Sequence, residues 1–86
     1  MTTTLANIRP GNKVKIVRIR GVTPTIRRLA DMGVVRNTVV TVQSIAPLGD
    51  PIGIKIRGYN LALRKVEAEG IEVQEIIEQP RHQVSQ

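Results

Sequence analysis

The sequence predicts a mainly β protein, a small barrel of about five short strands with one short helix between the first two strands. Three observations support this fold class. The 86 residues are enough for one core but not for two. The apolar residues are mostly Val, Ile and Leu, with one Tyr and no Phe or Trp, which favours strands. Short apolar–polar alternations are separated by glycine and proline, as strands are by turns.

The first predicted strand contains a change of phase. Residues Lys13–Ile16 alternate polar and apolar side chains, and Arg18–Arg20 resume the alternation one residue out of step. We therefore predict a β-bulge near Val17, which bends a strand as a small barrel requires. Residues 3–11, which precede this strand, are expected to be an irregular lead-in that ends in a turn.

The predicted helix follows this strand and has clear signals at both ends. Thr23 suits the N-cap, and Pro24 suits the first helical position because its missing N–H would have no partner there. Gly33 is expected to end the helix in a left-handed conformation. Apolar residues spaced three apart predict the buried stripe: Ile26, Leu29 and Met32.

Four further strands are predicted from alternation, at about residues 39–43, 52–56, 59–63 and 71–77. Gly58 predicts a tight hairpin between two of them. Residues 64–69 predict a single helical turn. Residues 1–78 are thus expected to form one domain, and residues 79–86 a disordered tail, because the tail contains nothing to bury.

The charge is distributed unevenly along the chain. Residues 1–65 carry twelve Lys/Arg and two Asp, a net charge of +10, whereas residues 66–86 carry one Arg and five Glu, a net charge of −4. A basic body favours an acidic partner, a nucleic acid or an anionic membrane face. Solubility alone explains such a surface equally well.

Composition excludes several kinds of protein. The absence of cysteine excludes disulfides, thiolate metal sites and thiol nucleophiles. The chain has no long apolar run, and its first residues lack the pattern of a secretion signal, so a soluble cytosolic protein is expected.

Catalytic residues are not recognisable in this sequence. His82 lies in the predicted tail, and neither Ser44 nor Ser85 lies in a nucleophile motif. There is no phosphate-binding Gly-x-x-x-x-Gly-Lys loop. We therefore expect no enzymatic activity and no cofactor.

A metal site is not expected either. Ferrous iron prefers clustered imidazole and carboxylate ligands, but the carboxylates that precede the last strand are scattered: Asp31, Asp50, Glu67 and Glu69. Adventitious binding through His82 and a neighbouring molecule stays open.

The segment 46–51, Ala-Pro-Leu-Gly-Asp-Pro, predicts a turn with an apolar tip. Pro47 and Leu48 form a stiffened tip that is a candidate anchor for a protein partner. Asp50 is expected to accept a hydrogen bond within its own turn, with a partner contact as the alternative.

The predicted helix supplies two basic candidates. Arg27 is the better candidate for meeting an acidic partner, because the stem of Arg28 has the alternative role of covering apolar surface next to Leu29. Asp31 is expected to form a local hydrogen bond or a salt bridge with a neighbouring arginine.

These segments, in this order and spacing, resemble the FeoA domain, the small cytosolic component of bacterial ferrous iron uptake. The resemblance spans about residues 5–77 and is carried by these features: Pro10-Gly11, Arg28-Leu29, Met32-Gly33, the 46–51 segment, Leu61–Arg64, Glu67-Ala68, Ile71 and Val73. One departure is Arg36-Asn37, where the family often has Pro-Gly. Because asparagine tolerates positive φ, the turn is expected to survive.

The resemblance implies an SH3-like barrel with the helix packed across one opening. It also implies a partner, the membrane ferrous iron transporter with its cytosolic GTP-binding domain. The predicted contact surface joins Pro47, Leu48 and Asp50 to the helix that bears Arg27 and Arg28. The inner, anionic face of the membrane is a further expected neighbour.

The alternative is a small basic barrel that binds RNA or the ribosome through phosphate contacts. Its weakness is that Tyr59 is the one aromatic residue available for base stacking. Exposed strand edges leave the oligomeric state open.

Overall fold

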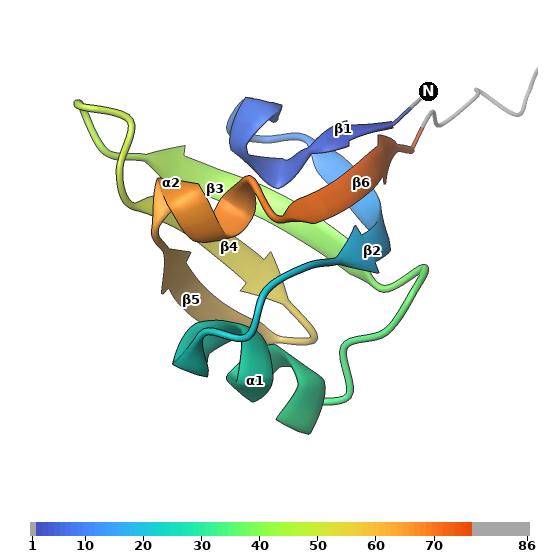
Figure 1. Ribbon diagram of the computed structural model, residues 1–86. Coiled ribbons are helices and arrows are strands. Elements are labelled where there is room, and N and C mark those ends of the chain that lie inside the picture. The colour runs from blue at the N-terminus through green and yellow to red at the C-terminus, as the bar shows by residue number, and fades with distance from the viewer. Residues whose placement is uncertain (1, 77–86) are drawn as a thin grey trace, which may run out of the picture.

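Six antiparallel strands form one curved sheet, in which the strands are ordered β1-β6-β2-β3-β4-β5 (Figure 1). The computed structural model describes residues 2–76. The strands are β1 (Thr2–Thr4), β2 (Lys13–Ile19), β3 (Val39–Ile45), β4 (Ile52–Ile56), β5 (Tyr59–Leu63) and β6 (Ile71–Glu75). The helices are the 3-10 turn η1 (Leu5–Asn7), α1 (Pro24–Asp31) and α2 (Lys65–Ala68).

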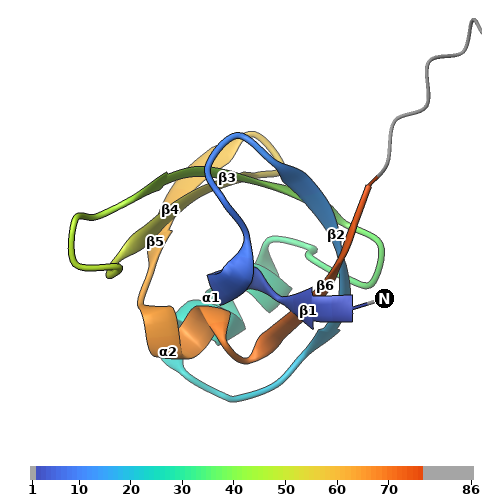
Figure 2. The same ribbon diagram turned by 90° about the horizontal axis from the view of Figure 1, so that it is seen from above.

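The sheet curls into a half-closed barrel, which Figure 2 shows in a view along the barrel axis. The predicted bulge is confirmed, because the β2–β6 register shifts between Ile16 and Arg18. A second shift, between Val42 and Ser44, bends β3 against β4. The outermost strands of the sheet order, β1 and β5, are not paired with each other.

One strand was not expected from the sequence. Residues Thr2–Thr4, which overlap the start of the predicted lead-in, pair with Glu72–Gln74 of β6 and make the sheet six-stranded. Three consecutive threonines have no apolar–polar alternation, and their partner strand lies about seventy residues away, so a local pattern cannot reveal the pairing. The rest of the lead-in forms η1, whose Leu5 is buried in the core.

Helix α1 closes one end of the barrel and has the predicted caps. The Ile26 backbone N–H donates to Oγ1 of Thr23 over 3.2 Å, and Pro24 occupies the first turn. Gly33 has a φ of +84°, which confirms the left-handed stop. Ile26 and Leu29 are buried in the core, so α1 is anchored by the predicted apolar stripe.

Two turns use non-glycine residues in the left-handed region. Arg57 and Gly58 have φ values of 51° and 84°, as a two-residue hairpin between β4 and β5 requires. Asn37 has a φ of 76°, so the expected turn survives without glycine.

The core lies inside the curved sheet and is entirely aliphatic. Its members come from every strand except β1, and from η1, both α-helices and the loops: Leu5, Ile8, Val14, Ile16, Ile26, Leu29, Val34, Val40, Val42, Ile52, Ile54, Ile56, Leu63, Ala68, Ile71 and Val73. The expected tail, residues 79–86, lies outside the described residues, as does the domain boundary at residue 78. No helix within residues 2–76 is long and apolar enough to cross a membrane.

Candidate protein-docking site

The β3–β4 loop, residues 46–51, is held in shape by its own backbone. The Ala46 N–H donates to the Pro51 carbonyl over 3.0 Å, and the Gly49 N–H donates to the Ala46 carbonyl over 2.7 Å. Leu48 at the tip is 94% exposed. A large apolar side chain is therefore presented to solvent on a constrained loop, which lowers the entropy lost when a partner binds it.

Asp50 plays a different role from the one the sequence predicted. Its Oδ1 accepts a hydrogen bond of 3.0 Å from the backbone N–H of Lys65, at the first residue of α2. The expectation of a bond within its own turn is therefore wrong. The carboxylate instead satisfies one of the free N–H groups of the α2 N-terminus and fastens the end of the loop to that helix.

A groove of about 480 Å³ lies beside the hydrogen bond between Asp50 and Lys65. Its lining comes from the start of α1, the end of the loop, the end of β5 and the start of α2: Thr25, Pro51, Ala62, Leu63, Arg64 and Glu67. The loop base and the N-terminal turn of α1 therefore border one concave surface, which we call the loop–helix groove.

Glu67 is the acidic residue of the loop–helix groove. Its Oε1 accepts a 3.0 Å hydrogen bond from the Arg64 backbone N–H, which lowers the pKa of the Glu67 carboxyl below its ordinary value. Slight burial raises this pKa and so opposes the effect, whereas the side chains of Thr23 and Thr25 lower the pKa further. The carboxylate thus stays charged at neutral pH and caps the N-terminus of α2.

The two predicted arginines are exposed but lie on different flanks of α1. Arg28 is three residues after Thr25, so it shares the flank that borders the loop–helix groove, whereas consecutive residues such as Arg27 and Arg28 do not face the same way. The tip of the β3–β4 loop projects away from α1 in both views (Figures 1 and 2). Helical spacing thus puts Arg28 on the flank of α1 that borders the groove, and the structure places neither arginine beside the tip of the β3–β4 loop.

Asp31 does not make its expected contact. It is exposed, and the ion pair found within residues 2–76 joins Arg20 and Glu72 instead, at 2.9 Å. The sequence reasoning also missed Thr25 and Glu67 as groove residues. A signal was present, because an acidic residue three positions after Arg64 has capping-box spacing.

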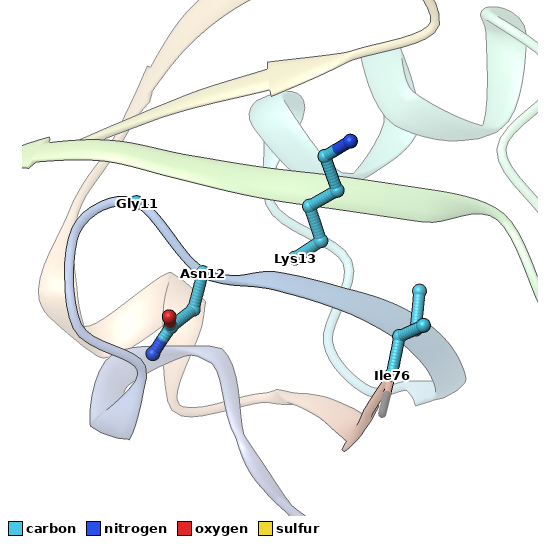
Figure 3. A pocket seen from close by; sticks show the side chains of 4 residues that line it. All are labelled: Gly11, Asn12, Lys13 and Ile76. Atoms are coloured by element: carbon cyan, nitrogen blue, oxygen red, sulfur yellow. The ribbon is translucent and has the colours of Figure 1, made fainter. Parts of the chain in front are cut away.

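A second, smaller depression of about 250 Å³ lies at the start of β2, lined by Gly11, Asn12, Lys13 and Ile76. Figure 3 shows that the side chains of Asn12 and Lys13 leave the backbone in opposite directions, so their polar groups do not converge. Within residues 2–76, no three His, Asp or Glu side chains lie close enough together to hold a metal ion. His82 lies outside the described residues.

Comparison with known proteins shows which family this chain resembles. Residues 3–75 match the FeoA domain. The chain is 38% identical over 70 residues to a fusion of Fe(2+) transport protein A with the Fe(2+) transporter FeoB from Porphyromonas gingivalis. That match covers 81% of this chain but 8% of the fusion protein, so the chain corresponds to a small part of that relative.

Solved structures agree with this fold. A FeoA-like protein from Clostridium acetobutylicum is 37% identical, with a TM-score of 0.76 and a match that covers 96% of each chain. FeoA of Stenotrophomonas maltophilia, described as a prokaryotic SH3 domain protein, is 22% identical, with a TM-score of 0.70 over 84% of this chain and 89% of that one. At 22% identity the second similarity shows the fold alone, and on that basis the half-closed barrel is SH3-like.

Proposed function

This chain belongs to the FeoA family, and we propose that it is a non-enzymatic accessory protein of ferrous iron uptake that binds the cytosolic GTP-binding part of the membrane ferrous iron transporter. The family is linked to ferrous iron transport, and in one relative a FeoA domain is fused to FeoB. This role places the chain in the cytoplasm, beside the transporter.

The fusion supports the choice of partner. Two domains joined in one chain meet at a high effective concentration, on the order of millimolar for a short linker, without a strong interface. In that relative the FeoA domain is therefore held beside the transporter, and we propose the same neighbour for this chain.

The observation that carries the proposal is the exposed Leu48 on the constrained β3–β4 loop. Interface energy concentrates in a few anchors that fill a pocket on the partner. Pro47 stiffens the tip, Asp50 fastens the loop to α2, and Arg28 lies on the groove flank of α1. An apolar anchor on the loop and a basic side chain on α1 fit a transporter domain that offers an apolar pocket for Leu48 and acidic side chains for Arg28.

Binding would act on the transporter by changing the balance between its conformations. A partner shifts an equilibrium only to the extent that it binds one state more tightly than the other. We therefore propose that the chain stabilises one conformation of the GTP-binding domain. Arg27, on the other flank of α1, is proposed as a peripheral contact of the same interface.

The test is the affinity of the full chain for the purified cytosolic domain of the transporter from the same organism, measured by calorimetry. Leu48→Asp should weaken binding by about thirtyfold or more, the usual cost of losing a central anchor. Val35→Asp is the matched control, because Val35 is also an exposed apolar residue, and its loop lies on the opposite side of the molecule from the β3–β4 loop (Figure 1). An unchanged affinity for Leu48→Asp would contradict this interface.

Capture from a cell lysate at low and high salt separates this function from RNA binding. Recovery of the transporter at both salt concentrations supports the accessory role. Recovery of RNA that is lost at high salt supports phosphate-mediated binding, which weakens steeply with salt.

A further inference from the structure

The outer face of the curved sheet carries a row of basic residues that the docking site does not use. The strand registers place Lys13 opposite Thr41, and Thr41 opposite Lys55. Residues directly opposite one another in antiparallel strands point to the same face. Because the intervening Val14, Val40 and Ile54 are buried, this row points outward. Lys15, two residues after Lys13, lies on the same face.

This face has almost no negative charge to neutralise it. Strands β2, β3, β4 and β5 contain no Asp or Glu. Two acidic residues lie on the adjoining strand β6 within residues 2–76: Glu72, opposite Arg18, is paired with Arg20 at 2.9 Å, and the exposed Glu75 is opposite Val14, whose side chain points inward. None of Lys13, Lys15 and Lys55 has an ion-pair partner within the described part of the chain. Their charges therefore remain available to an external anion.

Exposed valines border the same face. Val39, opposite Lys15 in the β2–β3 register, is 46% exposed. Val35, in the α1–β3 loop, is 63% exposed. The loop is tied to β2, because the Asn37 N–H donates to the Ile16 carbonyl over 2.7 Å. The three lysines and Val39 thus lie on one face of the sheet, and Val35 lies in the loop tied to its β2 strand; we call this set of residues the Lys–Val face.

From these observations we propose that the Lys–Val face contacts the anionic lipid headgroups of the membrane that holds the transporter. Lysines attract lipid phosphates, and the valines gain by entering the apolar boundary below the headgroups. RNA would use the lysines but not the valines, and it would require stacking platforms. Tyr59 lies opposite Ile56, whose side chain is buried, so it does not belong to the outer face.

This inference rests on the proposed function, because that function places the chain beside a membrane protein. The two surfaces use different residues, since the Lys–Val face lies on β2, β3, β4 and the α1–β3 loop, whereas the docking site lies on the β3–β4 loop, the groove and α1. One chain can therefore hold the transporter domain and the lipid surface at the same time. The lipid contact would also fix how the docking site is oriented toward the membrane.

The test is co-sedimentation of the full chain with vesicles of phosphatidylcholine containing about one third phosphatidylglycerol, near 0.1 M ionic strength, where screening extends over about 10 Å. Lys13→Glu/Lys15→Glu/Lys55→Glu should lower the vesicle affinity by at least about a hundredfold, since each well-placed lysine contributes about fivefold. Vesicles of phosphatidylcholine alone should bind neither protein. Val39→Ser should weaken binding of the otherwise unchanged chain.

The matched control is Arg9→Glu/Arg27→Glu/Arg28→Glu, which changes the net charge equally at exposed arginines outside the Lys–Val face. It should keep most of the vesicle affinity. An equal loss in both triple variants, no binding of the wild-type chain to anionic vesicles, or tighter binding to a single-stranded RNA in the same buffer would overturn the proposal.

The proposed function is tested separately by the affinity of the lysine variant for the soluble transporter domain without lipid. Unchanged affinity supports two separate surfaces. Loss of that affinity would assign the lysines to the protein interface and overturn the lipid contact. If the wild-type chain binds vesicles but not the domain, the proposed function fails and the lipid contact stands.

Discussion

The backbone N–H of Lys65 donates to Oδ1 of Asp50 over 3.0 Å, across fifteen residues of sequence. This bond joins the end of the β3–β4 loop to the first turn of α2, directly beside the loop–helix groove. The hydrogen bond therefore holds the base of the loop that carries Leu48 next to the groove. Flexibility at this bond would raise the entropic cost of docking.

Asp50→Ala should free the end of the loop. Loss of an exposed hydrogen bond with a charged acceptor is expected to lower the free energy of unfolding by about 1 kcal/mol. The amide hydrogen of Lys65 should exchange faster with solvent, which NMR measures at a single site. Asp50→Asn keeps an acceptor oxygen and should largely retain the protection. Unaltered exchange in the alanine variant would show that the bond is not formed in solution.

Glu67→Gln should show a pH-dependent effect on stability. The folded state lowers the pKa of the Glu67 carboxyl, so the unfolded state binds this proton more readily. The resulting stabilisation is complete above the unfolded pKa and is lost as pH falls through the lowered folded pKa. Since the carboxyl is largely solvent-exposed, we expect at most about 1 kcal/mol at neutral pH.

Urea denaturation of both proteins at neutral pH and at about pH 3 checks this prediction. The difference in unfolding free energy should shrink in acid, because the wild-type carboxyl becomes protonated there. Glutamine keeps the oxygen acceptor for the Arg64 N–H, so the change isolates the charge. A difference that is constant with pH would contradict the lowered pKa.

Gly33→Val tests the left-handed end of α1. A β carbon at Gly33 would lie an ordinary 3.8 Å from the Arg57 side chain, so space is not the obstacle. The obstacle is the φ of +84°, which costs a β-branched residue about 1–2 kcal/mol or more. Thermal unfolding should show this loss. Gly33→Asn should be much milder, and equal melting temperatures for wild type and Gly33→Val would disprove the conformational argument.

Gly70→Ala tests a close approach of two backbone segments. A β carbon there would lie 2.9 Å from the carbonyl oxygen of Arg20, whose own N–H donates to the Gly70 carbonyl over 2.7 Å. Since neither backbone segment can move without disturbing this contact, we expect a loss of about 1–3 kcal/mol in unfolding free energy. Gly70 is not among the glycines with a positive φ, so conformational strain does not add to this cost. An unfolding free energy unchanged by Gly70→Ala would refute the steric explanation.

Local patterns in the sequence predicted much of the fold. The phase slip around Val17 predicted the bulge, and Thr23, Pro24 and Gly33 predicted both ends of α1. These signals act between neighbours in the chain, which is why they can be read directly. Strand β1 could not be predicted, because Thr2–Thr4 acquire a strand conformation only by pairing with β6.

The candidate site was predictable only in part, for the same reason. The exposed apolar tip at Leu48 follows from its own turn sequence. The partner of Asp50 lies on α2, so local propensity favoured a bond within the turn that does not form. The proximity of Thr25 and Glu67 likewise depends on how α1 and α2 pack, which no spacing in the sequence reveals.

Titration of the isotope-labelled chain with the unlabelled cytosolic GTP-binding domain of the transporter, followed by NMR, tests the central claim most directly. We predict that amide shifts change at residues 46–51 and around the loop–helix groove, while those of Lys13, Lys15 and Lys55 stay constant. No shift changes at saturating domain, or changes confined to the three lysines and their strands, would contradict the account.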